Sequence, residues 1–251
     1  MIIKHPDPID FPEMRVLWRE AFGDSEAFLD IFWRTAFSPE RSHIAVSDGG
    51  VVGALYWLDS EIEGERCAYI YAVATKASER GKGICSTLME YTHRLLNDKG
   101  YSSALLVPGD EGLFAFYERL GYRCVCRVTE GEAVASVGEI PRKICAEEYS
   151  ALRHSLLPRG AVREGREGIA FLAETHSLYA TDDTVIAVRR EGDTLVASEL
   201  IGSTEPLQAL AFSMGLSSVR YRTAGEGRAF AMQYKLKDDA TVPSYLGLAF
   251  D

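Results

Sequence analysis

The stretch from Tyr69 to Ser86 constrains the fold of this 251-residue chain more than any other part of the sequence. It opens with apolar and β-branched residues between tyrosines, a pattern that is typical of a buried strand. A polar loop from Lys76 to Glu79 follows, and Arg80-Gly81-Lys82-Gly83 then leads into a predicted helix. The apolar residues of that helix recur at the spacing of one helical face, at Ile84, Leu88, Tyr91 and Leu95.

A strand, a basic glycine-bearing turn and a helix together can form a site for a phosphate group. The helix N-terminus supplies unpaired N–H groups and partial positive charge, and glycines let the backbone approach the ligand. The turn is not the dinucleotide-binding fingerprint G-x-G-x-x-G, and it is not a Walker loop because no G-K-[ST] follows. Taken alone, an ordinary strand-to-helix connection explains the turn about equally well.

The same stretch resembles the acyl-CoA-binding segment of the GCN5-related N-acetyltransferases, the GNAT superfamily. The pattern of that family is Gln or Arg, two residues, Gly, one residue, and Gly or Ala. Arg80, Gly83 and Cys85 occupy these positions here. Cys85 departs from the pattern, but it is small and often behaves as a modest apolar residue.

A second motif, Leu113 to Tyr122, resembles the other characteristic element of the family. There a Phe-Tyr pair on a short helix precedes a glycine and an aromatic residue, as Phe116, Tyr117, Gly121 and Tyr122 do here. The resemblance implies that Tyr117 protonates the departing CoA thiolate. A phenol can do this because its ordinary pKa of about 10 keeps it protonated at neutral pH. The alternative is a packed aromatic residue with a satisfied hydroxyl.

The resemblance, which covers about residues 2–140, implies transfer of an acetyl group from acetyl-CoA to an amine by direct attack. The acceptor is expected to be a small amine or a peptide N-terminus. The backbone from Val73 to Thr75 would hold the pantetheine arm, and the splay after the Tyr69 to Thr75 strand would aim an amide at the thioester oxygen. The residues assigned in this way to acetyl-CoA are Val73, Ala74, Thr75, Arg80, Gly81, Lys82, Gly83, Ile84, Cys85 and Ser86.

The general base is left open by the sequence. His43, Glu61 and Glu63 are candidates because they lie near the predicted central strands, and a chain of water molecules would also serve. Cys85 precedes a helix, where a thiol pKa is lowered, but the bound cofactor is expected to cover it, so we do not predict a cysteine nucleophile. An acyl-CoA-binding regulatory or scaffold protein without transfer activity is the alternative to an enzyme.

Composition limits the possible partners. The formal charge of −10 argues against sequence-independent nucleic-acid binding, which needs a basic surface, and it suits a cationic acceptor. No apolar run reaches the roughly 20 residues of a membrane helix, and no signal peptide is recognised, so a cytoplasmic monomer or homodimer is expected. The five cysteines are expected to be reduced thiols, and no metal site is predicted.

The order of predicted elements favours an α/β (α+β) protein in two domains. Residues 1–140 would form a GNAT domain, a mixed central sheet flanked by helices, with two short strands around Glu130-Gly131 at its end. Residues 144–251 repeat the order hairpin, strand, helix and strand, which indicates a smaller, degenerate GNAT-like domain. This copy lacks the phosphate loop, because Glu205 repels phosphate and Pro206 removes a donor.

The last nine residues, P-S-Y-L-G-L-A-F-D, are unusually apolar for a chain end. Tyr245, Leu246, Leu248 and Phe250 are therefore expected to dock rather than to fray. Some acyltransferases of this fold, including mycobacterial aminoglycoside acetyltransferases, use a C-terminal carboxylate as the base. Asp251 is a candidate for that role, although a segment that simply closes the second domain is the stronger interpretation.

Overall fold

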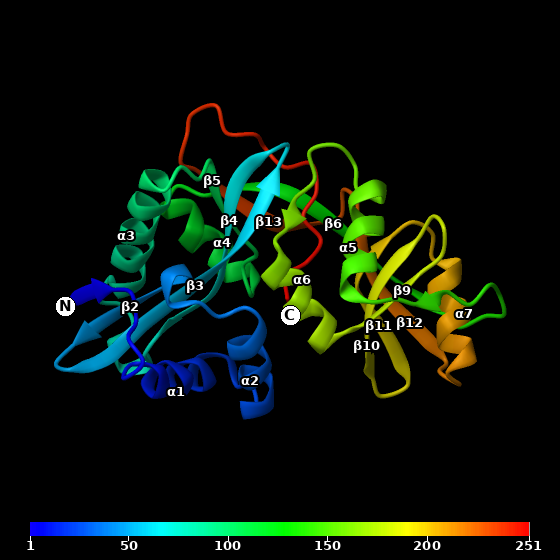
Figure 1. Ribbon diagram of the computed structural model, residues 1–251, viewed down its shortest axis with the longest axis horizontal. Coiled ribbons are helices and arrows are strands. Elements are labelled where there is room, and N and C mark those ends of the chain that lie inside the picture. Colours follow the sequence, from blue (N-terminus) through cyan, green and yellow to red (C-terminus); the bar gives the residue numbers. More distant parts are fainter. Residues whose placement is uncertain (251) are drawn as a thin grey trace. The chain divides into compact units, whose positions relative to one another are not determined.

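The computed structural model of the protein describes residues 1–250 and divides the chain into two compact units (Figure 1). The first unit contains Met1–Arg123, Glu164–Gly168 and Gln233–Thr241. The second contains Cys124–Arg163, Ile169–Met232 and the segment from Val242 onward. Each unit is a mixed α/β structure, so the predicted fold class is confirmed.

The first unit is built on a sheet with the strand order β1-β2-β3-β4-β5. Strands β1 to β4 are antiparallel, whereas β4 and β5 are parallel and are connected through helix α3. The bounds are β1 Ile2–Lys4, α1 Phe11–Phe22, α2 Glu26–Thr35, β2 Ser42–Ser47, β3 Gly50–Ile62, β4 Glu65–Thr75, α3 Ile84–Asp98, β5 Ser103–Leu106 and α4 Glu111–Arg119.

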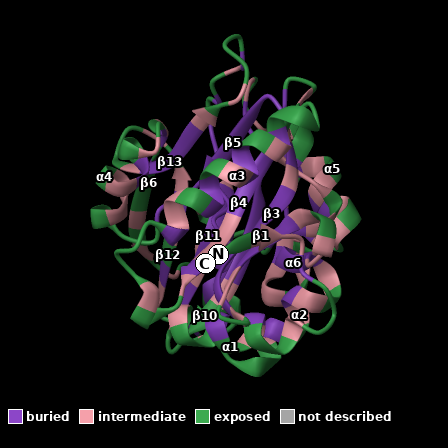
Figure 2. Cartoon of the chain, turned by 90° about the vertical axis from the view of Figure 1, so that its left-hand side faces the viewer, coloured by how far each residue is buried: buried purple, intermediate pink, exposed green. Residues whose placement is uncertain are grey.

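Side chains at alternate positions of β3 point toward α1 and toward α3. Tyr56 packs against Trp18 of α1, with ring centroids 5.0 Å apart, and neighbouring Trp57 contacts His43, which itself reaches α3. Successive side chains of a strand point to opposite faces, so α1 and α3 cover different faces of the sheet. Both faces of β3 are therefore covered, and Figure 2 shows β3 largely as buried residues.

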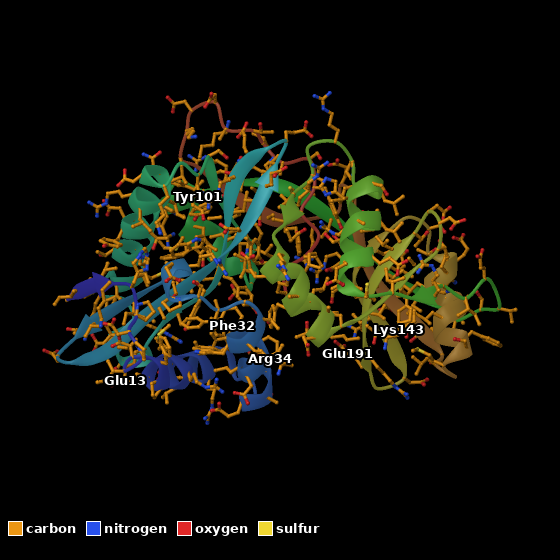
Figure 3. The ribbon with its side chains drawn as sticks, viewed as in Figure 1. Glu13, Phe32, Arg34, Tyr101, Lys143 and Glu191 are labelled. Carbon is orange, nitrogen blue, oxygen red and sulfur yellow. The ribbon has the colours of Figure 1, made fainter. Side chains whose placement is uncertain are left out.

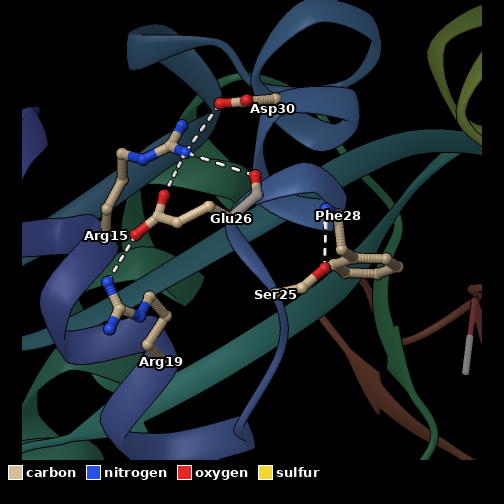
Figure 4. Close-up of polar contacts among 6 residues, drawn as sticks. All are labelled: Arg15, Arg19, Ser25, Glu26, Phe28 and Asp30. Carbon is tan, nitrogen blue, oxygen red and sulfur yellow. Dashed lines mark hydrogen bonds and ion pairs between the residues drawn. The ribbon is translucent and has the colours of Figure 1, made fainter.

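Helices α1 and α2 are joined by charged side chains (Figure 4). Arg15 pairs with Glu26 at 2.5 Å and with Asp30 at 2.7 Å, and Ser25 caps α2 by accepting the Phe28 N–H at 3.2 Å. Asp10 stands at the N-cap position of α1, but its side chain does not cap the helix. The Asp10 carboxylate instead accepts the Asp7 N–H at 2.8 Å, which closes the preceding turn.

The second unit has the strand order β6-β12-β11-β10-β9-β7. Strands β11 and β12 are parallel and are connected through α7, which repeats the β4-α3-β5 arrangement of the first unit. The bounds are β6 Arg123–Val134, β7 Arg142–Lys143, α5 Ala146–Leu156, β8 Arg163–Glu164, α6 Arg166–Thr175, β9 Ser177–Ala180, β10 Val185–Glu191, β11 Thr194–Ile201, α7 Glu205–Ser213, β12 Ser218–Ala224 and β13 Arg228–Lys235. Helix α6 and strand β9 were not predicted.

The two short strands expected around Glu130-Gly131 are in fact one strand, β6, so that prediction is wrong. Gly131 lies opposite Tyr221 of β12, and a side chain at Gly131 would overlap the Tyr221 ring. The glycine therefore makes room for a cross-strand aromatic ring instead of forming a turn.

Gly131→Ala is expected to destabilise the protein by about 1–3 kcal/mol, because the added methyl group overpacks the β6–β12 pair. Urea denaturation measures the loss. In a Tyr221→Ala background the same substitution should cost much less, because the overlapping ring is gone. Equal costs in both backgrounds would contradict this packing explanation.

The apolar chain end is docked, as predicted, and it packs within the second unit. Tyr245, Leu246, Leu248 and Phe250 are all buried. Glu199 anchors this segment, since its carboxylate accepts the Tyr245 hydroxyl at 3.3 Å and pairs with Arg153 of α5 at 2.6 Å.

Two further observations concern the whole described chain. None of the helices in residues 1–250 combines the length and the apolar character that crossing a membrane would require. The five cysteines are free thiols, and Cys124 is exposed whereas Cys126 is buried.

Candidate functional site

The loop between β4 and α3 has the backbone that its glycines predict. Gly81 and Gly83 have φ angles of 78° and 80°, a left-handed region that favours glycine. Apart from the glycine itself and its chain neighbours, no atom lies within 4 Å of the position that a Cβ would take at either glycine. The loop therefore presents its backbone to open space, and Arg80 braces it by donating from Nε to the Thr75 carbonyl at 3.3 Å.

Helix α3 begins directly after Gly83, which is its N-terminal cap residue. Ile84 is buried and anchors the helix on the sheet, whereas Arg80, Gly81, Lys82 and Gly83 are exposed. The first amides of a helix have no partner within the helix. An anion that reaches this loop would therefore meet unpaired N–H groups and the positive end of the α3 dipole.

Cys85, in the first turn of α3, is not an activated thiol. Burial raises its pKa to about 11, which outweighs the lowering that a helix N-terminus provides. The thiol is thus protonated at neutral pH, in agreement with the expectation that Cys85 is not a nucleophile.

Strand β4 carries a bulge and then leaves its neighbour β5. Two residues, Ala72 and Val73, stand opposite Leu55 of β3, and Ala72 has a φ of 48°. The pairing of β4 with β5 covers Cys67 to Tyr69, whereas β4 continues to Thr75. The strand end from Val73 to Thr75 therefore extends beyond the parallel pair, where an extended ligand could add to its edge.

Thr75 provides independent evidence that this strand end can accept a further hydrogen-bond partner. Its hydroxyl oxygen is buried and forms no hydrogen bond within residues 1–250. A buried polar atom without a partner is uncommon in a folded protein. The orphaned hydroxyl lies in the same residue whose carbonyl binds Arg80, at the start of the glycine loop.

Tyr117 lies on α4 close to the first turn of α3. It is 8% exposed, and its hydroxyl makes no hydrogen bond to any residue that the structure describes. Burial raises its pKa above the usual value, and the nearby Cys85 and Asp110 raise the pKa further. The phenol is therefore protonated at neutral pH and available as a proton donor. The structure thus places together the loop, the end of β4, the start of α3 and Tyr117.

The comparisons with known proteins agree with this geometry. Residues 3–125 match the family model described as acetyltransferase (GNAT) domain. This segment belongs to the GNAT acetyltransferase family. For this segment the general reaction class is therefore acyl transfer, and the family predicted from the sequence is confirmed.

The fold of nearly the whole chain is also found in solved structures. A GCN5-related N-acetyltransferase from Kribbella flavida matches with a TM-score of 0.73 and 18% identity, over 95% of this chain and 72% of that chain. One from Anabaena variabilis gives a TM-score of 0.74 and 15% identity, over 94% and 73%. Eis1 from Mycobacterium abscessus gives 0.69 and 13%, over 96% and 75%. At these identities the likeness shows the fold alone. None of the curated proteins matches the chain.

The GNAT domain does not support the three candidate bases from the sequence. His43 is fully buried, binds Thr92 of α3 at 2.8 Å, and has its pKa lowered to about 3 by burial. Glu61 lies opposite Arg66 in the β3–β4 pair. Arg66 is six residues before the bulge residue Ala72, so the two are separated by roughly 20 Å along the strand. Glu63 follows in the turn beyond it. His43 is thus enclosed in the core, and both glutamates lie at the end of the β3–β4 hairpin that is far from the bulge.

The corresponding loop of the second unit is closed by neighbouring protein atoms. The lack of a phosphate site in this unit stays a prediction. A Cβ at Gly202 would lie 2.6 Å from the Asp183 carbonyl oxygen and still closer to the Thr184 hydroxyl. Thr184 also accepts the Ser203 N–H at 3.2 Å. Protein atoms thus fill the space that Gly81 and Gly83 leave open in the GNAT domain.

A buried pair behind Tyr117 was missed by the sequence analysis. His93 of α3 forms a 2.8 Å hydrogen bond with the Tyr122 hydroxyl, and the Tyr122 ring packs edge-on against Tyr117 at 5.7 Å. The His93 ring stacks on Tyr234 at 4.1 Å. The aromatic residue after Gly121 therefore has a packing role that fixes the position of Tyr117.

Asp251, the proposed base, lies outside the described residues. The roles of Tyr117, of Asp251 and of the acetyl-CoA residues accordingly stay predictions.

Proposed function

We propose that this protein transfers an acetyl group from acetyl-CoA to a primary amine by direct attack. The proposal rests on the open glycine loop that follows β4. This strand carries a bulge and extends beyond its parallel neighbour β5. This arrangement offers an anion site and a free strand edge side by side. Acetyl-CoA carries a pyrophosphate and an amide-containing arm, which have the chemistry to fill these two places.

We assign residues of this chain to each part of acetyl-CoA. The amides from Arg80 to Ser86 would hold the pyrophosphate, because the loop backbone is exposed and both glycines leave space for a ligand. The strand end from Val73 to Thr75 would pair with the pantetheine arm. The unpartnered Thr75 hydroxyl would then gain a polar partner on binding.

In the proposed reaction the amine nitrogen attacks the thioester carbonyl carbon and forms the new C–N bond. An amide of the β4 bulge would stabilise the oxyanion. The C–S bond then breaks, Tyr117 donates its proton to the departing sulfur, and the nitrogen gives up a proton to the base. Positioning supplies much of the acceleration, since aligned reactants reach effective molarities of roughly 10⁵ M or more.

The acceptor is proposed to be a small amine or a peptide N-terminus. The net charge of −10 attracts a cationic amine over long range. Helices α1 and α2 would form one wall of its groove, where Trp18 packs against Phe32 (labelled in Figure 3) at 4.7 Å. The buried hydroxyl of Tyr56 in this cluster has no hydrogen-bond partner within residues 1–250.

We propose the carboxylate of Asp251 as the base. Phe250, the residue before Asp251, is 6% exposed and packs against Phe171 with ring centroids 5.9 Å apart. Phe250 is therefore held in place within the second unit. Deleting Phe250 and Asp251 should lower kcat at least about tenfold while the Kd for acetyl-CoA changes little. Phe250→Ala, which keeps Asp251, is the matched control for lost packing. Equal losses of kcat in the two variants would contradict the base role.

The decisive experiment is the release of free CoA thiol from acetyl-CoA in the presence of a panel of amines. Small diamines, amino sugars and short peptides with free N-termini cover the proposed classes. Thiol release that depends on one class supports the proposal and names the acceptor. Tight acetyl-CoA binding without amine-dependent release would instead favour an acyl-CoA-binding regulatory or scaffold protein.

A further inference from the structure

The second unit contains a cavity that the acetyl-transfer reaction does not use. Its volume is ≈ 500 Å³, within the range of small-molecule sites. The cavity lies among β7, the start of α5, the end of α6, β9 and the end of β10. The polar residues that line it are Lys143, Cys145, Glu174, Thr175, His176, Ser177, Arg189 and Arg190.

The charge of this lining is opposite to that of the chain as a whole. Three cations and one carboxylate line the cavity, whereas the chain has a formal charge of −10. Lys143 (labelled in Figure 3) and Arg190 form no ion pair within residues 1–250. Arg190 donates through Nε to the Gly192 carbonyl at 2.8 Å, which fixes its stem and leaves its terminal nitrogens for another acceptor.

The floor of the cavity is organised by hydrogen bonds. His176 links Thr175 and Ser198 through its two ring nitrogens, each at 2.9 Å. Arg189 donates to the same Ser198 hydroxyl at 2.9 Å and pairs with Glu191 at 3.0 Å. Arg189 is therefore paired and positioned, and Lys143 and Arg190 are the lining cations that form no ion pair within residues 1–250.

We propose that this cavity binds a small anionic metabolite that carries a phosphate or carboxylate group. Lys143 and Arg190 provide the charge-assisted hydrogen bonds, and the hydroxyl of Ser177 adds a neutral donor. The site differs from the glycine loop of the GNAT domain in its residues and in its unit. It also differs from the closed loop before α7. The anion site of the second unit is therefore not at the position that corresponds to the GNAT phosphate loop.

The test uses the full chain with inorganic phosphate and citrate as separate probes in titration calorimetry. At least one probe should bind in the millimolar range or tighter, with affinity that falls as NaCl rises. Phosphate binding alone identifies a phosphate ligand, and citrate binding alone identifies a carboxylate ligand. Lys143→Gln and Arg190→Gln should each weaken binding about tenfold, because each removes a charged donor.

Three controls separate this site from other anion binding. Lys143→Arg keeps the charge and should keep the affinity within about threefold. Arg94→Gln removes an exposed cation of α3 that does not line the cavity and should change nothing. Because the loop of the GNAT domain is itself proposed as an anion site, the titrations are repeated in a Gly83→Val background. Binding that depends on Lys143 and Arg190 should persist there. Failure of both probes to bind, or equal binding in the Lys143→Gln, Arg190→Gln and Arg94→Gln variants, would overturn the proposal.

Discussion

Gly83→Val is expected to abolish measurable acetyl-CoA binding while the protein remains folded. The valine side chain would project into the space where the proposed pyrophosphate lies, since no protein atom occupies it. The φ of 80° adds strain of at least about 1–2 kcal/mol, which a domain with typical stability tolerates. Titration calorimetry with acetyl-CoA measures the binding, and circular dichroism measures the fold.

Gly64→Val is the matched control for this prediction. Gly64 has a φ of 85°, and a Cβ there also meets no atom within 4 Å, but it lies in the turn between β3 and β4. The two variants carry the same backbone strain, and only Gly83 lies in the proposed phosphate site. Wild-type affinity in Gly83→Val, or an equal loss in Gly64→Val, would remove the phosphate-binding role from the loop.

Tyr117→Phe is expected to lower kcat at least about tenfold and to leave the Kd for acetyl-CoA unchanged. General acids typically contribute about 10²–10⁴-fold in rate. The pKa of Tyr117 is raised by burial, so the phenol keeps its proton up to and beyond its ordinary value of about 10. The wild-type rate should therefore show no loss of this acid between neutral pH and about pH 9.

Tyr122→Phe is the control for the loss of a buried hydroxyl. That hydroxyl bonds to His93 and does not face the reaction, so its removal should lower stability by about 1–3 kcal/mol. The expected result is a lower melting temperature with kcat within a few-fold of wild type. A fully active Tyr117→Phe enzyme would return Tyr117 to a packing role.

Local sequence determined the elements that hold the candidate site. The basic glycine turn, the following helix and the Phe-Tyr pair were each predicted, because positive φ angles and helical periodicity depend on neighbouring residues. The buried chain end was predicted for a related reason, since four large apolar side chains cannot remain exposed at low cost.

Other features depend on residues that are distant in the sequence. The neighbouring residues predict a turn at Gly131. Only its position opposite Tyr221 makes Gly131 part of a continuous strand. The buried face of α3 includes Thr92 and His93, which are polar and were not expected in a core. Thr92 binds His43 and the Leu88 carbonyl, and His93 binds Tyr122. No periodicity in α3 reveals such partners.

The reactive geometry was likewise decided by the tertiary structure. Ala72 carries no signal for a left-handed backbone, yet the pairing of β4 with β3 imposes it and so creates the bulge. The sequence determined which residues form the glycine loop and the helix, because those choices depend on local backbone preference. Where β4 leaves β5, which polar groups are buried, and which cations share a cavity depend on strand register and packing, and these exist only in the folded chain.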